Sequence, residues 1–199
     1  MKVNEYFDRV VVINLDRRPD RMDRLGAQLD ELGIEYERFS AIDAKELDVK
    51  GYVAGTMSHV AVLKKYEDQK ILVLEDDALF CEGFNEKFAE AIEALPNNWD
   101  VFYLGALVDP KTGKTIEVNN HWHKQIVSTG SHAYCILPYR MKYFIEQLDG
   151  YEWYIDIGLR VFAEKYQALI AQPNLVTQFP SYSDFSVSVE YQSNTSCIG

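Results

Sequence analysis

Cysteine and basic residues are scarce in this chain of 199 residues, and long apolar runs are missing. The three cysteines, Cys81, Cys135 and Cys197, form neither a paired disulfide framework nor a metal-binding spacing, which favours reduced thiols. A total of 20 Lys and Arg against 31 Asp and Glu gives a formal charge of −11, which argues against a nucleic-acid partner or an anionic membrane surface. No segment approaches the ~20 apolar residues of a transmembrane helix, and the N-terminus lacks the apolar region of a signal peptide. We therefore expect a cytoplasmic protein with no transmembrane segment.

Apolar residues are abundant enough for one substantial core. Hydrophobic residues make up 47% of the chain and aromatic residues 13%. The sequence predicts a single domain over residues 1–190. Residues 191–199 are polar, and we expect a tail or a linker to an additional domain there.

One apolar run ends abruptly in three carboxylates. Residues 71–74 lack polar alternation, which is typical of a central strand buried on both faces of a parallel sheet. Glu75, Asp76 and Asp77 then emerge at the carboxyl end, where open α/β sheets bind ligands, with Asp76 pointing away from the other two. Their mutual repulsion favours a bound cation, and oxygen ligands favour Mn²⁺ or Mg²⁺, which commonly accompany a diphosphate. The alternative is that the acids cap the next helix in water.

The first forty residues predict a βαβ unit. Val10–Asn14 is a buried strand, and Pro19 opens a helix that Gly33 terminates. A second strand over Glu35–Phe39 follows, so the loops of the unit gather at one edge of the sheet.

Three arginines, Arg17, Arg18 and Arg21, lie where the first strand gives way to its helix. This is a position at which the phosphates of a nucleotide would meet positive charge and free backbone N–H groups. Equally, these arginines could pair with the aspartates of the same segment as a solvated helix start.

Periodicity and turn residues predict further elements along the chain. In the helix expected from Gly55 to Tyr66, Met57 should face inward, and Gly105 should mark a close approach after its strand. Residues 106–108 and 115–118 should be edge strands joined by a turn, with a polar loop over 119–124, and residues 169–171 and 175–177 should close the sheet. The remaining predicted elements are helices over 84–95, from Pro138 and from about Ile155, and strands over 101–104 and 131–137.

Seven short segments, taken together and in order, resemble those of glycosyltransferase family 25, the lipopolysaccharide and collagen galactosyltransferases. No single segment is decisive, but the series extends over about three quarters of the chain. The segments are Val11–Arg21, Arg38–Asp43, Gly55–His59, Ile71–Ala78, Phe102–Gly105, Gly130–Tyr134 and Ile155–Asp156.

The resemblance implies an α/β fold of the GT-A type: a Rossmann-like, mostly parallel central sheet flanked by helices, with a small antiparallel acceptor-side portion. It implies a nucleotide-binding half over about 8–105 and an acceptor half over about 106–190. The implied activity is a hexosyltransferase reaction from a nucleotide-sugar donor, with UDP as the first expectation for the nucleotide, to a glycan or glycoconjugate hydroxyl. The family is assigned as inverting.

The resemblance also implies roles for individual residues. Glu75-Asp76-Asp77 would replace the family's Asp-x-Asp motif, with Asp77 as the main ligand of Mn²⁺ or Mg²⁺, Glu75 as a second ligand, and Glu75 or Asp76 on the ribose or donor sugar. The other residues expected around the donor are Asn14, Leu15, Arg17, Arg21, Asp43 and His59. His59 could instead be a structural, hydrogen-bonded residue.

A transferase of this kind needs a carboxylate base for the acceptor hydroxyl. We expect Asp156 in that role, with Asp184 as the second candidate.

Two other classes of protein stay open. A nucleotidyltransferase would want a Gly-rich, Lys-containing loop after the first strand, whereas Leu15–Arg21 has no glycine. A catalytically silent carbohydrate-binding or scaffold domain would bind glycan without transferring sugar.

Overall fold

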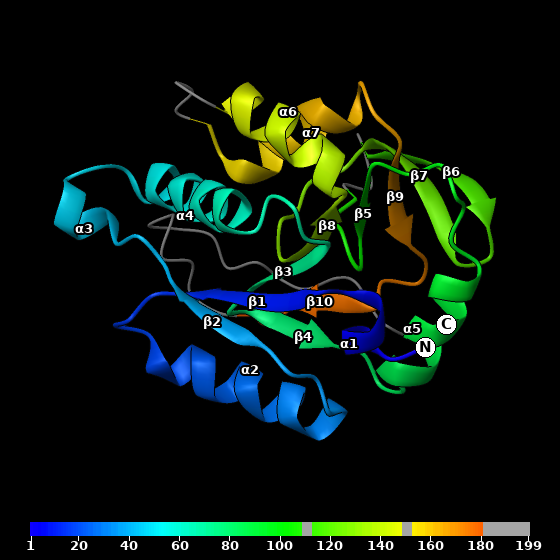
Figure 1. Ribbon diagram of the computed structural model, residues 1–199, viewed down its shortest axis with the longest axis horizontal. Coiled ribbons are helices and arrows are strands. Elements are labelled where there is room, and N and C mark those ends of the chain that lie inside the picture. The colour runs from blue at the N-terminus through cyan, green and yellow to red at the C-terminus, as the bar shows by residue number, and fades with distance from the viewer. Residues whose placement is uncertain (109–112, 149–152, 181–199) are drawn as a thin grey trace.

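The computed structural model of the chain describes residues 1–108, 113–148 and 153–180, in which helices cover both faces of a central sheet (Figure 1). No helix in these ranges is both long and apolar enough to cross a bilayer. The helices are α1 (Val3–Tyr6), α2 (Pro19–Leu32), α3 (Ala44–Leu47), α4 (Gly51–Lys65), α5 (Phe84–Glu93), α6 (Pro138–Leu148) and α7 (Ile155–Ala163). The strands are β1 (Arg9–Asn14), β2 (Glu37–Ser40), β3 (Ile71–Glu75), β4 (Ala78–Phe80), β5 (Val101–Tyr103), β6 (Lys114–Asn119), β7 (Trp122–Val127), β8 (Ala133–Ile136), β9 (Ala168–Ala171) and β10 (Val176–Gln178).

The central sheet has the strand order β2-β1-β3-β8-β5-β9-β7-β6. β1 pairs in parallel with both β2 and β3, and β5 pairs in parallel with β9. β8 runs antiparallel to both β3 and β5, so β5 and β9 point the same way as β1 and β3. The antiparallel hairpin β6–β7 extends the far edge through β7 and β9. The predicted fold class, a mostly parallel sheet flanked by helices with an antiparallel portion, is confirmed.

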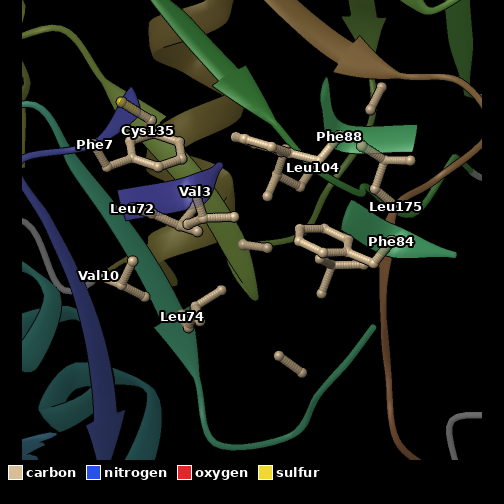
Figure 2. Close-up of a cluster of buried hydrophobic side chains, with 14 of the residues drawn as sticks. Val3, Phe7, Val10, Leu72, Leu74, Phe84, Phe88, Leu104, Cys135 and Leu175 are labelled. Carbon is tan, nitrogen blue, oxygen red and sulfur yellow. The ribbon is translucent and has the colours of Figure 1, made fainter. Parts of the chain in front are cut away.

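Alternate residues of β3 enter two hydrophobic clusters, one on each face of the sheet. Leu72 and Leu74 belong to a cluster with residues of α1, α2 and α5, whereas Ile71 and Val73 belong to a cluster with residues of α4, α6 and α7. Figure 2 shows Leu72 and Leu74 in the first cluster, together with Val3 of α1 and with Phe84 and Phe88 of α5. All four of these β3 side chains are fully buried. The predicted central strand, buried on both faces, is therefore confirmed.

The predicted βαβ unit is also confirmed. β1, α2 and β2 follow one another, and Gly33 ends α2 in the left-handed conformation, with φ of 66°. Because β1, β2 and β3 are parallel, their last residues Asn14, Ser40 and Glu75 form one edge of the sheet. This edge, the sheet mouth, carries the functional site described below.

The inward face predicted for the α4 helix is partly wrong. α4 begins at Gly51 rather than Gly55, and Met57 is 40% exposed. The buried face of α4 includes the polar residues Thr56, Ser58 and His59. Apolar periodicity misassigned the helix because it cannot detect a buried face built from hydrogen-bonding side chains.

Two strand predictions and one loop prediction are also wrong. β10 does not close the main sheet but pairs antiparallel with β4 in a separate two-stranded sheet. Residues 106–108 contribute only a bridge from Leu107 to Thr129, and β6 pairs with β7 across residues expected to form a polar loop. The error in the predicted polar loop is explained by Trp122, which is buried in β7 and whose indole N–H donates to the Ala91 carbonyl at 2.6 Å. The turn expected over residues 109–112 lies outside the described residues.

Gly105 behaves as predicted. A Cβ at this position would collide with the backbone carbonyl of Val176, just beyond the end of β5. The close approach of the two backbones lets Leu175 and Val176 donate their N–H groups to the Leu104 carbonyl. Only glycine fits here without a shift of the chain that leads into β10.

Candidate functional site

The three predicted acids follow β3 at the sheet mouth, and each contacts a different part of the protein. Glu75 lies beside His59 of α4, Asp76 lies against Arg21 of α2, and Asp77 lies beside β10. α2 and α4 contribute to the clusters on opposite faces of the sheet. The prediction that Glu75 and Asp76 point to opposite sides is therefore confirmed.

Asp76 is buried and already has a positively charged partner. The Asn14 side-chain amide donates to its Oδ2 at 2.8 Å, and Arg21 Nη1 donates to its Oδ1 at 3.0 Å. Burial raises the pKa of Asp76, while these two partners act in the opposite direction. Asn14 is itself buried and accepts from Arg38 Nε at 2.9 Å. The structure thus places Asn14 and Arg21, both predicted to contact the donor, as supports of Asp76.

Glu75 is held by two hydrogen-bonding residues. Its Oε1 accepts from the Ser131 hydroxyl and lies 3.4 Å from His59 Nε2. The other ring nitrogen of His59 lies 3.0 Å from the Tyr134 hydroxyl, so a buried chain of polar groups runs from β8 through α4 to β3. Although burial opposes ionisation, these contacts with His59 and Ser131 lower the pKa of Glu75. The carboxylate is therefore charged and fixed in direction.

Asp77 differs from its two neighbours. Its Oδ1 atom is buried and has no hydrogen-bond partner among the described residues, and its Oδ2 has only a 3.5 Å contact from the Gln178 amide. Burial, together with the charges of Glu75 and Asp76, raises the pKa of Asp77 to about 7. A buried carboxylate oxygen without a partner is costly, so its retention here calls for an explanation.

A metal ion is compatible with Asp77, in one particular way. Within the ranges that the structure describes, no three His, Cys, Asp or Glu side chains group together as a metal site. Mg²⁺, however, is usually held by one or two carboxylates together with substrate phosphates. The unpartnered Asp77 oxygen fits such a shared site. Because Asp76 and Glu75 already have partners, the repulsion expected among three acids acts mainly on Asp77, whose pKa their charges raise.

A pocket of about 460 Å³ opens where β1 and β2 end. Arg17 Nε donates to Asp43 Oδ2 at 2.7 Å beside it, and the Ser58 hydroxyl accepts from the N–H of Ile42 at 2.9 Å, tying the pocket wall to α4. The pocket is lined by Asp16, Arg17, Ser40, Ala41, Ile42, Asp43, Glu46 and Leu47. Arg17 and Asp43, two of the residues predicted around base and ribose, are thus brought together; Leu15 lies next to the pocket in sequence but does not line it.

The charges of this pocket favour a neutral ligand group with hydrogen-bond donors. Of the three carboxylates that line the pocket, Asp43 pairs with Arg17 and Asp16 pairs with Arg38, so Glu46 leaves an excess of negative charge. The backbone N–H of Lys45 is the main cause that lowers the pKa of Asp43, and Arg17 adds to it, so this carboxylate stays ionised at neutral pH. Phosphate groups would be repelled here, whereas ribose hydroxyls and base N–H groups would find acceptors.

Asp156 lies in the first turn of α7, as predicted, and is half-buried. Its Oδ1 accepts from the N–H of Ile157 at 2.8 Å. Burial raises the pKa of Asp156, and the charge of Glu75 adds to this rise. The buried hydroxyl of Tyr103, also within electrostatic reach of Asp156, has no hydrogen-bond partner among the described residues. Asp184, the second candidate base, lies outside the described residues.

Four residues of the site were not assigned from the sequence. Ser131 and Tyr134 belong to the strand predicted over residues 131–137 and to one of the resembling segments, but their roles appear only once β8 is placed beside β3. Arg24 Nη2 donates to the Asp76 backbone carbonyl at 3.3 Å, and its spacing of three residues from Arg21 on α2 could have revealed it. Gln178 reaches Asp77 from β10, a pairing with no signal in the sequence.

Comparison with curated proteins supports the predicted resemblance. No protein-family model matches the chain. "Procollagen galactosyltransferase 2" of Mus musculus is 30% identical over 129 residues, which cover 50% of this chain and 21% of that protein. "Inactive glycosyltransferase 25 family member 3" of Homo sapiens is 30% identical over 142 residues, which cover 56% of this chain and 24% of that protein. The resemblance to glycosyltransferase 25 family members is confirmed, although the chain spans about a quarter or less of the length of these relatives.

Among solved structures, UDP-glucose pyrophosphorylase in complex with UDP-glucose aligns with a TM-score of 0.50 and 8% sequence identity. The alignment covers 82% of this chain and 72% of that chain. At this identity the likeness concerns the fold alone. It agrees with the mixed α/β architecture and the mostly parallel sheet described above.

Proposed function

We propose that this chain belongs to glycosyltransferase family 25 and transfers a hexose from a nucleotide-sugar donor to a hydroxyl of a glycan or glycoconjugate. The observation that carries the proposal is the buried Oδ1 of Asp77 at the sheet mouth, which has no hydrogen-bond partner in the part of the chain that the structure describes; a pocket suited to a nucleoside lies at the ends of the neighbouring strands. The similarity to proteins named glycosyltransferases supports the same reaction class.

The donor would lie across the ends of β2, β1 and β3. Neighbouring strands are about 4.8 Å apart, so the pocket over β1 and β2 is separated from Asp77 by roughly 5–10 Å. A ribose and a diphosphate bridge such a distance. We assign the base and ribose to the pocket with Arg17 and Asp43, and the diphosphate to the end of β3, where Arg21 and Arg24 add positive charge beside the acids.

Asp77 would hold Mn²⁺ or Mg²⁺ jointly with the diphosphate of the donor. Such an ion, when bound, stabilises the negative charge of the departing nucleotide diphosphate. Its binding would also relieve the unfavourable burial of the Asp77 carboxylate. We assign Glu75 to the donor sugar rather than to the metal, because His59 and Ser131 fix its direction.

Asp156 would act as the base that accepts the proton of the acceptor hydroxyl. Its raised pKa, caused mainly by burial, makes it a stronger base than an exposed aspartate. The hydroxyl oxygen then attacks the anomeric carbon from the face opposite the diphosphate, the bond to the diphosphate breaks, and the configuration inverts. UDP is our first choice of nucleotide.

A catalytically silent glycan-binding domain is the second candidate. The relative named inactive and the internal pairing of Asp76 and Glu75 favour it. A nucleotidyltransferase has less support, because the first strand–helix loop contains no glycine.

Release of nucleotide from UDP-, GDP- and dTDP-sugars in Mn²⁺, with and without glycan acceptors, tests the proposal. We expect release from one donor class, lost in an Asp77→Asn variant and reduced in Asp156→Asn. Absence of release from every donor would favour the silent domain. Formation of a nucleotide-sugar and pyrophosphate from a nucleoside triphosphate and a sugar phosphate would identify a nucleotidyltransferase instead.

A further inference from the structure

Two tyrosines from different helices form an exposed aromatic stack at the start of α4 and α7. The rings of Tyr52 and Tyr154 are 4.3 Å apart, centroid to centroid, and inclined by 19°. Tyr154 is 48% exposed, so a large part of the ring pair faces solvent. A stacked ring pair that is partly exposed offers a flat, rigid apolar surface to a ligand.

The stack is held in place by the backbone around it. The Thr56 hydroxyl, one turn along α4 from Tyr52, donates to the Trp153 carbonyl at 2.6 Å. The Tyr154 carbonyl accepts from the N–H of Gly158 at 3.1 Å in the first turn of α7. The ring pair therefore joins the beginnings of two helices and is formed before any ligand arrives, which reduces the entropy lost on binding.

The position of the stack relates it to the proposed reaction. Tyr154 immediately precedes α7 and lies two residues before Asp156, the proposed base. α4 begins on the side of the sheet where β1 and β2 end and where α3 lies (Figure 1). The nucleoside pocket is lined from the β1 and β2 ends and from α3, without Tyr52 or Tyr154. The stack is thus close to Asp156 along the chain and does not line the pocket assigned to the nucleoside.

We propose that Tyr52 and Tyr154 form a stacking platform for a pyranose ring of the acceptor. One face of a pyranose carries several C–H groups, and these pack against the negative face of an aromatic ring. The hydroxyls at the edge of the sugar ring then remain free to reach a carboxylate. This inference rests on the proposed function for its biological meaning, but the sugar binding that it predicts is measurable without any transfer.

Saturation-transfer NMR with the methyl glycosides of glucose, galactose, mannose and N-acetylglucosamine tests the platform. We expect saturation of the pyranose C–H protons of at least one glycoside by the wild-type protein. Tyr154→Ala should weaken this binding about 3- to 10-fold, as loss of an aromatic stacking contact does, while Tyr154→Phe should retain it. Tyr143→Ala is the matched control, because Tyr143 is 53% exposed on α6, and binding should be unchanged.

The platform is refuted if the wild-type protein binds none of these glycosides, or if Tyr143→Ala weakens binding as much as Tyr154→Ala. A comparable loss in Tyr154→Phe would assign the effect to the phenol hydroxyl and also refute stacking. Tyr154→Ala should leave affinity for UDP unchanged, and a loss of UDP affinity would assign the stack to a nucleobase instead. Glycoside binding without nucleotide release would support the platform and contradict the transferase proposal. Nucleotide release without glycoside binding would support the transferase proposal and refute the platform.

Discussion

Replacing Asp77 with asparagine should stabilise the metal-free protein at neutral and alkaline pH. In the folded chain the pKa of Asp77 rises from 3.8 to about 7, mainly through burial. The folded state therefore holds this proton when the unfolded chain has already lost it. Stability must fall as the pH rises from the unfolded value toward the folded one, and the loss is complete above about pH 7.

The magnitude follows from the two pKa values. A rise of this size corresponds to an upper limit of about 4 kcal/mol of lost stability at pH 8, and about 2 kcal/mol at pH 5. Because Asp77 is partly accessible and interacts with two other acids, we expect roughly half of these values. Asparagine avoids the ionisation, so Asp77→Asn should exceed wild type by about 2 kcal/mol at pH 8 and by less at pH 5.

Urea unfolding in the presence of a metal chelator, at several pH values between 5 and 8, measures this difference. Asp76→Asn is the matched control, because it removes the charge of the carboxylate that accepts from the buried Arg21 guanidinium, and it should destabilise the protein by about 3 kcal/mol. The two neighbouring substitutions should thus have opposite signs at pH 8. An Asp77→Asn variant that is no more stable than wild type at pH 8 would refute the argument that this carboxylate is kept at the expense of stability.

Three further predictions follow from other parts of the structure. Asp156→Asn should lower the rate of transfer about 100-fold while leaving the calorimetric affinity for the donor nearly unchanged, and an unaltered turnover number would remove Asp156 from the role of base. Gly105→Ala should destabilise the protein by several kcal/mol in urea, because its Cβ meets the Val176 backbone; Gly33→Ala, at a positive φ with open space around it, should cost only about 1 kcal/mol, and equal losses would contradict the close approach. His59→Ala should raise the pKa of Glu75, which side-chain NMR of the carboxyl carbon measures, whereas an unchanged pKa would mean that His59 does not act on Glu75.

Much of the β1–β3 side of the sheet was predictable because its signals are local. The run over residues 71–74 is apolar without interruption, and Gly33 ends a helix of regular period, so β3 and α2 were identified from the sequence alone. The placement of the three acids at a sheet edge followed from the same pattern. These features depend on neighbours in sequence, for which periodicity and turn chemistry are informative.

The pairing of segments that are distant in sequence was harder to predict. β10 joins β4 rather than the main sheet, and the order in which β8 lies between β3 and β5 cannot be derived from the period of either strand. The state of the acids depends on these pairings, since Ser131 reaches Glu75 only through β8, and Gln178 reaches Asp77 only through β10. The sequence therefore indicated where the carboxylates lie but not that two of them are already paired.

Calorimetric titration of UDP into the protein, with and without Mn²⁺, tests the central claim most directly: that Oδ1 of Asp77 binds a divalent cation together with a diphosphate. We predict tight binding only when Mn²⁺ is present, and a loss of at least about tenfold in affinity, 1.4 kcal/mol, in Asp77→Asn. GDP and dTDP serve as alternatives if UDP does not bind. Affinity that is the same with and without Mn²⁺, or the same in Asp77→Asn as in wild type, would contradict the account.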